Sequence, residues 1–262
     1  RALACRDAEG DLLRAVPRLL EMLAGLPPAT REPIVRWTGE LALGMGLFVG
    51  LDRGTGWTAL STREALSAYM YYVAGTVGGM LDELIGSRVG RPSGTEARAQ
   101  AARAIRFGLG LQATNVLQDL SVDRKRGWSY LPEEVARRHG TATDRLHRPE
   151  EADRAMGAVR EIARDAAAYL DDGLEYVLAF PRRRVRVRLF CLWPLLLAVR
   201  TLTLVCSGPA VLVDRVRIGR REVRDLAREG RARALSNRAL RGLYRRERSR
   251  LDPLIAAKEG ES

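Results

Sequence analysis

The feature that most constrains the fold of this chain is the helical spacing of its apolar residues, which recur every three to four positions along most of its length. Glycine and proline interrupt this pattern only in short breaks, and none is long enough to be an interdomain linker. The spacing predicts helices at residues 11–25, 31–50, 62–86, 95–123, 149–178, 185–206 and 220–257. We therefore expect an all-α fold in which residues 1–262 form a single-domain helical bundle.

Strand signals are few. Val185–Leu189 alternates apolar residues with arginines and is interpreted as the start of a helix, whereas Val211–Ile218 has the composition of a short strand without a clear partner. Local chemistry marks two helix starts. Ser61 and Glu64 have the spacing of a capping box, and Pro132 suits the first turn of another helix.

The charge of the chain is strongly basic, with a formal net charge of +12. Of its 44 basic residues only Lys125 and Lys258 are lysines, and the arginines are scattered along the predicted helices. Aromatic residues make up 6% of the chain, and no basic run interleaves with them as a base-stacking surface requires. We therefore expect no nucleic-acid partner, and peripheral association with a membrane stays open.

The cysteines and the longest apolar run indicate the cellular compartment in which the protein is located. Cys5, Cys191 and Cys206 are odd in number and widely spaced, so neither a disulfide framework nor a zinc site is indicated. The run Leu189–Val199 is broken by Pro194 and is shorter than the about 20 residues that span a bilayer. A cytoplasmic protein fits best. The chain opens on a charged segment without Met, which suggests a fragment.

The most informative segment is a polar stripe on an otherwise apolar helix. Gln112, Asn115, Asp119 and Asp123 are spaced three, four and four residues apart, so their side chains fall within an arc of about 80°. Two carboxylates one turn apart repel each other unless a cation lies between them, and Mg²⁺ with a substrate diphosphate fits that need. The alternative is an exposed helix end whose aspartates pair with the basic residues 124–126.

A second segment places small residues on one predicted helix face. Ala68, Tyr72, Gly75 and Gly79 are spaced four, three and four residues apart. A glycine inside a helix costs about 1 kcal/mol relative to alanine, so the glycines need a reason. One explanation is close packing of helices, and the other is a channel beside Tyr72 for a long apolar substrate chain.

Both segments resemble motifs of the squalene and phytoene synthase family. Tyr69–Gly78, YMYYVAGTVG, resembles the family's YxxYVAGxVG motif, and Leu111–Asp123 resembles its second aspartate-rich motif, LQxTNxxxDxxxD. Pro132 in YLPEEV is similar to a W/YLP element, and Phe190–Leu202 is similar to a late helix of squalene synthases. The similarity extends from about residue 11 to residue 225.

The resemblance implies a helical bundle of the isoprenoid synthase type around a deep cavity. It implies an enzyme, a prenyl transferase that joins two prenyl diphosphates head to head with the help of Mg²⁺. Farnesyl diphosphate would give presqualene diphosphate and squalene, while geranylgeranyl diphosphate would give phytoene. Squalene synthesis is slightly favoured by the late helix, and use of NADPH stays open.

The resemblance also assigns roles to individual residues. It makes Asp119 and Asp123 the catalytic metal ligands, together with Asn115, and makes Tyr72 a catalytic residue that assists proton removal or steadies the cation. The expected substrate-binding residues are Tyr69, Gly75, Gly79, Gln112, Asn115 and Arg126.

Three positions depart from the family pattern. Val122 stands where many members carry an acidic residue, Gln118 where an arginine is common, and Trp128 where an arginine often follows the glycine. Each departure removes a contact to diphosphate or metal. The second hypothesis is a noncatalytic isoprenoid-binding subunit that keeps the fold while lacking one metal cluster, and a weaker third one is a basic protein that binds membranes or nucleic acid.

The first aspartate-rich motif of the family should precede the predicted helix Leu12–Ala24 and is not in this sequence. We expect the chain to lack N-terminal helices of the domain, and to bind a prenyl diphosphate without completing the condensation on its own. Asp7 and Asp11 share the DxxxD spacing but flank Gly10 in what resembles the loop after that motif. A set of further polar residues is interpreted as solvated surface: Asp171, Asp172, Glu175, His139 and His147.

Overall fold

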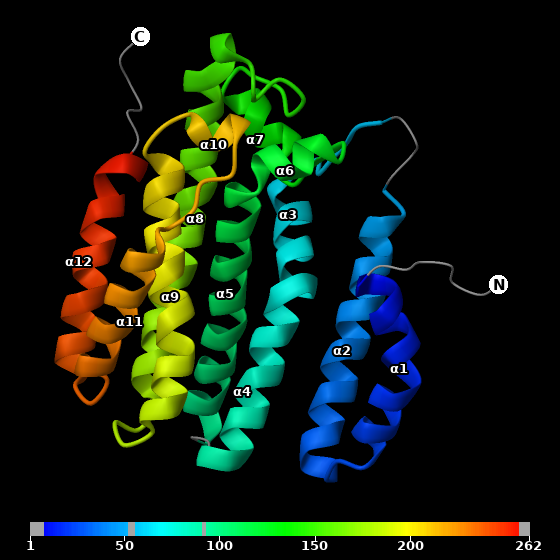
Figure 1. The fold of residues 1–262 in the computed structure, drawn as a ribbon, viewed down its shortest axis with the longest axis vertical. Coiled ribbons are helices and arrows are strands. Elements are labelled where there is room, and N and C mark those ends of the chain that lie inside the picture. The colour runs from blue at the N-terminus through cyan, green and yellow to red at the C-terminus, as the bar shows by residue number, and fades with distance from the viewer. Residues whose placement is uncertain (1–7, 52–55, 91–92, 257–262) are drawn as a thin grey trace.

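The computed structural model describes residues 8–51, 56–90 and 93–256, which form a bundle of helices with one two-stranded sheet (Figure 1). The first half contains α1 (Ala8–Ala24), α2 (Pro28–Val49), β1 (Thr58–Ala59), α3 (Arg63–Met70), the π-helix η1 (Tyr71–Gly75), α4 (Thr76–Val89), α5 (Gly94–Gln118), α6 (Leu120–Lys125) and β2 (Trp128–Ser129). The second half contains α7 (Glu133–Arg138), the 3-10 helix η2 (Pro149–Glu151), α8 (Ala152–Ala179), α9 (Val185–Cys206), α10 (Ala210–Val213), α11 (Arg220–Arg233) and α12 (Asn237–Ile255). The predicted all-α fold is confirmed.

Several predicted boundaries shift for local reasons. The helix expected at 95–123 breaks at Asp119, and the one expected at 220–257 divides where the Ser236 side chain caps α12 by accepting from the backbone N–H of Ala239 at 3.2 Å. The predicted cap at Ser61 is wrong by one residue, because Thr62 caps α3 by accepting from the Ala65 N–H. Val211–Ile218 is not a strand. Its first residues belong to α10 and the rest is irregular.

The centre of the bundle is the pair α5 and α8, which share the most extensive helix contact. In Figure 1, α4, α5, α8 and α9 run side by side, with α1 and α2 at one edge and α11 and α12 at the other. Small side chains permit the close approach of α5 to α8. A Cβ on Gly110 would lie 3.0 Å from side-chain atoms of Tyr169 and Leu170. The alanines of α8 that are buried in this contact region and around it are Ala155, Ala158, Ala163, Ala166 and Ala167.

Two glycines bring the η1–α4 segment against α5. A Cβ on Gly78 would lie 2.3 Å from the carbonyl oxygen of Ala104, and a Cβ on Gly108 would lie 2.3 Å from the carbonyl oxygen of Ala74. Because the obstructing atoms are backbone atoms, the two helices would have to separate to admit a side chain at either position.

We therefore expect Gly78→Ala to lower the free energy of unfolding by about 1–3 kcal/mol, since overpacking outweighs the gain in helix propensity. The matched control is Gly242→Ala on α12, where nothing lies within 4 Å of the added Cβ and the stability should rise by up to about 1 kcal/mol. Urea unfolding of both variants measures the difference. Equal effects in the two variants would contradict the close packing of α4 on α5.

The edge formed by α1 and α2 presents an unusual amount of apolar surface. Among the described residues of these helices and the turns that follow them, the exposed large apolar side chains are Leu12, Leu13, Val16, Leu19, Leu20, Met22, Leu26, Val35, Leu43, Leu47, Val49 and Leu51. Leu43 keeps 79% of its surface exposed. Apolar surface of this extent is typical of faces that contact other polypeptide or lipid.

Helix α9 is long and apolar enough to cross a membrane by length and composition, and it is the one such helix in the described ranges. It extends beyond the short run Leu189–Val199, but 61% of its most apolar window is buried in the bundle. The fully buried Arg188 donates to the Phe180 carbonyl oxygen at 3.0 Å and to Asn237 Oδ1 at 2.6 Å. This burial is typical of a core helix.

Candidate active site

The face of α5 that looks toward α4 and α9 changes character along its length. Its lower part is apolar and includes Ala104, Gly108 and Leu111, which line a cavity. The same helical face continues upward through Asn115 to Asp119. One helix therefore carries an apolar wall and, one to two turns away, a polar end.

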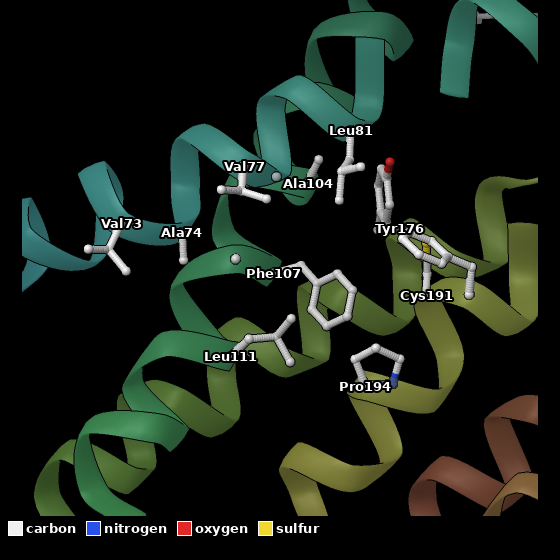
Figure 2. A pocket seen from close by; sticks show the side chains of 13 residues that line it. Val73, Ala74, Val77, Leu81, Ala104, Phe107, Leu111, Tyr176, Cys191 and Pro194 are labelled. Atoms are coloured by element: carbon white, nitrogen blue, oxygen red, sulfur yellow. The ribbon is translucent and has the colours of Figure 1, made fainter. Parts of the chain in front are cut away.

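The cavity at the apolar end has a volume of about 230 Å³ (Figure 2). Val73, Val77 and Leu81 line one wall at a spacing of four residues. The remaining lining residues are Ala74, Gly78, Ala104, Phe107, Gly108, Leu111, Tyr176, Phe190, Cys191 and Pro194. Burial raises the pKa of the Cys191 thiol to about 12, so this side chain stays neutral. The chamber suits a hydrocarbon chain.

Tyr69 lies at the polar end, one turn before Val73. Its side chain is buried, and its ring stacks on Tyr130 with the ring centroids 4.3 Å apart. Burial, the hydrogen bond with Tyr130 and the nearby Asp123 carboxylate raise the pKa of Tyr69 far above its usual range, while the hydrogen bond with Gln112 opposes them. The Tyr69 hydroxyl is therefore protonated and connected to the polar stripe of α5.

Tyr72 is not placed where the sequence pattern predicted. Its ring lies against Gly44 of α2, where an added Cβ would come within 2.0 Å of Tyr72 Cδ1, and its centroid is 6.4 Å from that of Phe48. Tyr72 does not line the cavity, although its neighbour Val73 does. The apolar cavity therefore lies along Val73 and Val77 and not beside Tyr72, where the sequence analysis expected a channel.

The glycines predicted to clear a channel instead make close helix contacts. A Cβ on Gly75 would meet Leu109 and Ile105 of α5, while a Cβ on Gly79 would lie 2.6 Å from the Trp37 ring of α2. Neither glycine lines the cavity, whereas Gly78 does. The predicted channel beside Gly75 and Gly79 is therefore corrected to close helix packing.

The two aspartates meet where α5 ends and α6 begins. Asp119 occupies the break itself, and the backbone N–H of Asp123 donates to its carbonyl oxygen at 2.9 Å. Burial, and then the Asp119 carboxylate, raise the pKa of Asp123 to about 6, while Arg126 and Arg215 oppose the shift. The raised pKa is the electrostatic sign of two carboxylates held together in a partly buried position.

The remaining predicted polar residues border this end. Asn115 is exposed on the same face of α5 as Asp119, and Arg126 is exposed just after α6. Arg126 is close enough to Asp123 to lower its pKa.

Sequence reasoning missed two residues that the fold brings to the polar end of the site, Tyr130 and Arg215. Tyr130 reaches Tyr69 because β2 pairs in parallel with β1, and the tight turn before β2 has Gly127 at φ 77°. The YLP element was the available signal for Tyr130. Arg215 lies in the irregular segment after α10 and contacts Asp119. No local sequence pattern predicts the contact between Arg215 and Asp119.

The residues at this end fit a magnesium ion in combination with a substrate. In the described part of the chain no group of three or more His, Cys, Asp or Glu side chains is placed to hold a metal. Mg²⁺ commonly takes one or two carboxylates and completes its shell with water and substrate phosphates. Asp119 Oδ1 is buried and accepts no hydrogen bond, and a cationic group, the Arg215 guanidinium, already lies against it. Asp119, Asp123 and Asn115 are the residues that fit.

The other acidic residues of the sequence have different partners. Asp171 accepts from the Tyr244 hydroxyl at 2.7 Å, and Asp172 and Glu175 pair with arginines on neighbouring helices. Asp11 pairs with Arg14 on α1. Asp7 and Cys5 lie outside the described residues.

His139 is not the plain surface residue that was expected. Its Nε2 lies 2.8 Å from Oε2 of the buried Glu161, whose Oε1 accepts from Arg63 at 2.7 Å and also contacts Arg138. This network joins α3, α7 and α8. Its position indicates a structural role.

Comparisons with known proteins agree with this architecture. The sequence model of the family described as squalene/phytoene synthase matches residues 2–222. The squalene synthase of Cyberlindnera jadinii is 28% identical over 201 residues, which cover 77% of this chain and 44% of the relative. The human squalene synthase is 26% identical over 83% of this chain and 50% of its own length. The phytoene synthase of Thermus thermophilus is 34% identical over 55% of this chain and 52% of its own length.

A solved complex of TcSQS with the ligand BPH1237 superposes with a TM-score of 0.82 at 21% identity, covering 98% of this chain and 71% of that one. At this identity the superposition shows a shared fold. The chain spans about half the length of the curated relatives it matches. Because the family match covers most of the sequence, the chain belongs to the squalene/phytoene synthase family.

Proposed function

We propose that the natural protein carrying this chain condenses two prenyl diphosphates head to head. The observation that carries the proposal is the single α5 face that runs from the apolar chamber to the paired carboxylates Asp119 and Asp123. A prenyl diphosphate has the same polarity, with a hydrocarbon tail at one end and a highly charged head at the other. Family membership supports the same reaction class.

Each part of the site has a distinct task in the proposed reaction. Asp119, Asp123 and Asn115 would hold Mg²⁺, which supplies charge neutralisation to the departing diphosphate. Arg126 would add positive charge beside the head group. The apolar wall excludes water, which would otherwise quench an allylic cation. The protonated Tyr69 hydroxyl, held by Gln112, would direct its dipole toward the reacting end.

Farnesyl diphosphate is the substrate we favour, with presqualene diphosphate and then squalene as products. The support is that the similar curated relatives include the squalene synthases of yeasts and of human. Phytoene synthesis from geranylgeranyl diphosphate is the second candidate, since the relative with 34% identity is a phytoene synthase. NADPH would be required only for the step to squalene. A noncatalytic isoprenoid-binding subunit is the competing function.

The test is to incubate the natural protein with farnesyl or geranylgeranyl diphosphate and Mg²⁺, with and without NADPH, and to identify products by mass spectrometry. We expect presqualene diphosphate from farnesyl diphosphate, squalene when NADPH is added, and no product with EDTA. Binding of labelled farnesyl diphosphate without any product would favour the noncatalytic subunit.

Val77→Phe should raise KM for farnesyl diphosphate at least about tenfold, because the added ring fills the chamber.

A further inference from the structure

The segment 214–219, here called the strap, connects α10 to α11 and is held against the polar end of the site (Figure 1). It has no regular structure, but two side-chain contacts fix it. Gln118 Nε2 at the end of α5 donates to the carbonyl oxygen of Val216 at 2.7 Å. Arg215 contacts Asp119. The strap is therefore anchored at Asp119 and at the residue before it.

The contact between Arg215 and Asp119 involves both carboxylate oxygens. Arg215 Nε lies 2.5 Å from Oδ1, outside hydrogen-bonding alignment, and Nη2 donates to Oδ2 at 3.3 Å. A guanidinium in this position occupies the space in front of the carboxylate that a metal ion bound to Asp119 would need. The two cations therefore compete for one ligand.

We propose that Arg215 is a positioning residue that exchanges partners when the substrate binds. In the metal-free protein its guanidinium neutralises Asp119. When Mg²⁺ arrives with the diphosphate, Arg215 leaves the carboxylate and binds the diphosphate oxygens. This inference rests on the proposed function, because it assumes that Asp119 binds the metal.

The physical chemistry of the contact favours such an exchange. The Arg215 and Asp119 side chains are 37% and 28% exposed, so their ion pair contributes little and is easily replaced. Arginine remains charged throughout and binds phosphate oxygens through two parallel N–H groups. The contact of Gln118 with Val216 keeps the strap in place while the Arg215 side chain moves.

This arrangement also gives Gln118 a task at the polar end of the site. The glutamine supplies no charge, but its amide holds the strap that brings Arg215 to the site. The strap thereby brings a positive charge to the end of α5.

The test measures two affinities in the natural protein and in Arg215→Gln. Mn²⁺ binding without diphosphate is followed by the EPR signal of the free ion, and pyrophosphate binding at saturating Mg²⁺ is followed by calorimetry. We expect Arg215→Gln to bind Mn²⁺ about fivefold more tightly, because a competing cation is gone, and pyrophosphate about tenfold more weakly. Arg215→Lys should fall between the two for pyrophosphate.

The matched control is Arg217→Gln, which makes the same charge change on the same strap but two residues away. It should leave the Mn²⁺ affinity within about twofold of the natural value, since screening reduces the effect of a distant exposed charge. Circular dichroism checks that each variant is folded. Shifts of the two affinities in the same direction, or no shift in either, would overturn the exchange and leave a plain ion pair. Absence of Mn²⁺ and pyrophosphate binding in the natural protein would overturn the proposed function as well.

Discussion

Replacing Asp119 by asparagine is expected to lower turnover by about two orders of magnitude or more, without unfolding the protein. The amide has nearly the shape of the carboxylate but no charge, so it weakens the metal site that would neutralise the departing diphosphate. Asp119 also lies at the point where α5 ends and α6 begins, and it contacts Arg215. The change therefore acts on the polar end of the site and leaves the apolar chamber intact.

The measurement is kcat of the natural protein and of Asp119→Asn with farnesyl diphosphate at saturating Mg²⁺. Asp172→Asn is the matched control, because Asp172 carries the same charge on α8 and pairs with Arg106 away from the cavity lining. It should change kcat less than about threefold, as expected for loss of a partly exposed ion pair. Near-normal turnover in Asp119→Asn would exclude the metal-ligand role and favour the view that this aspartate only pairs with basic neighbours.

The fold was largely predictable because helical periodicity is a local signal. Buried residues recur at helical spacing in α8 and α9; α9 has its predicted bounds, and α8 begins and ends within three residues of its predicted bounds. The polar stripe was equally accessible, since Gln112, Asn115 and Asp119 follow one another on the uninterrupted turns of α5. Where the chain keeps a regular 100° step, the sequence alone places side chains on the correct face.

The assignment of Tyr72 to the substrate site failed because helical spacing shows which residues share a face but not what that face contacts. The face of Ala68, Tyr72 and Gly79 exists, but it packs on α2, as the contacts of Tyr72 with Gly44 and of Gly79 with Trp37 demonstrate. The wider turn of η1 at Tyr71–Gly75 also disturbs the regular step in the middle of the motif. A pattern of small residues in a sequence predicts that another part of the structure packs closely against them. Only the fold shows which part that is, here helix α2.

Contacts between residues that are distant in the sequence could not be predicted from local sequence patterns. Arg215 reaches Asp119 through the path of the chain after α9, and Tyr130 reaches Tyr69 through the pairing of β1 with β2. Each β-strand has only two residues, so neither produces a recognisable alternation. The polar end of the site is therefore assembled by tertiary structure around a stripe that the sequence does reveal.

Tyr69→Phe is expected to lower kcat about 100-fold, whereas Tyr72→Phe should change it less than about threefold. The two tyrosines belong to the same motif, and the substitutions remove the same hydroxyl group. Tyr69 is hydrogen bonded to Gln112 and lies near Asp123, while Tyr72 packs its ring on Gly44 of α2. The two variants therefore remove the same hydroxyl group at two places: Tyr69→Phe at the polar end of the site, and Tyr72→Phe outside the site.

The loss in Tyr69→Phe should appear in kcat more than in KM, because the hydroxyl is proposed to act on the reacting end and the prenyl chain is bound elsewhere. The phenylalanine ring can still stack on Tyr130, so the unfolding free energy should fall by only about 1 kcal/mol for the lost hydrogen bond. Steady-state kinetics with farnesyl diphosphate and urea unfolding separate these effects. A large loss in Tyr72→Phe with little change in Tyr69→Phe would return the catalytic role to Tyr72, and it would mean that α2 moves away from Gly44 to admit the substrate.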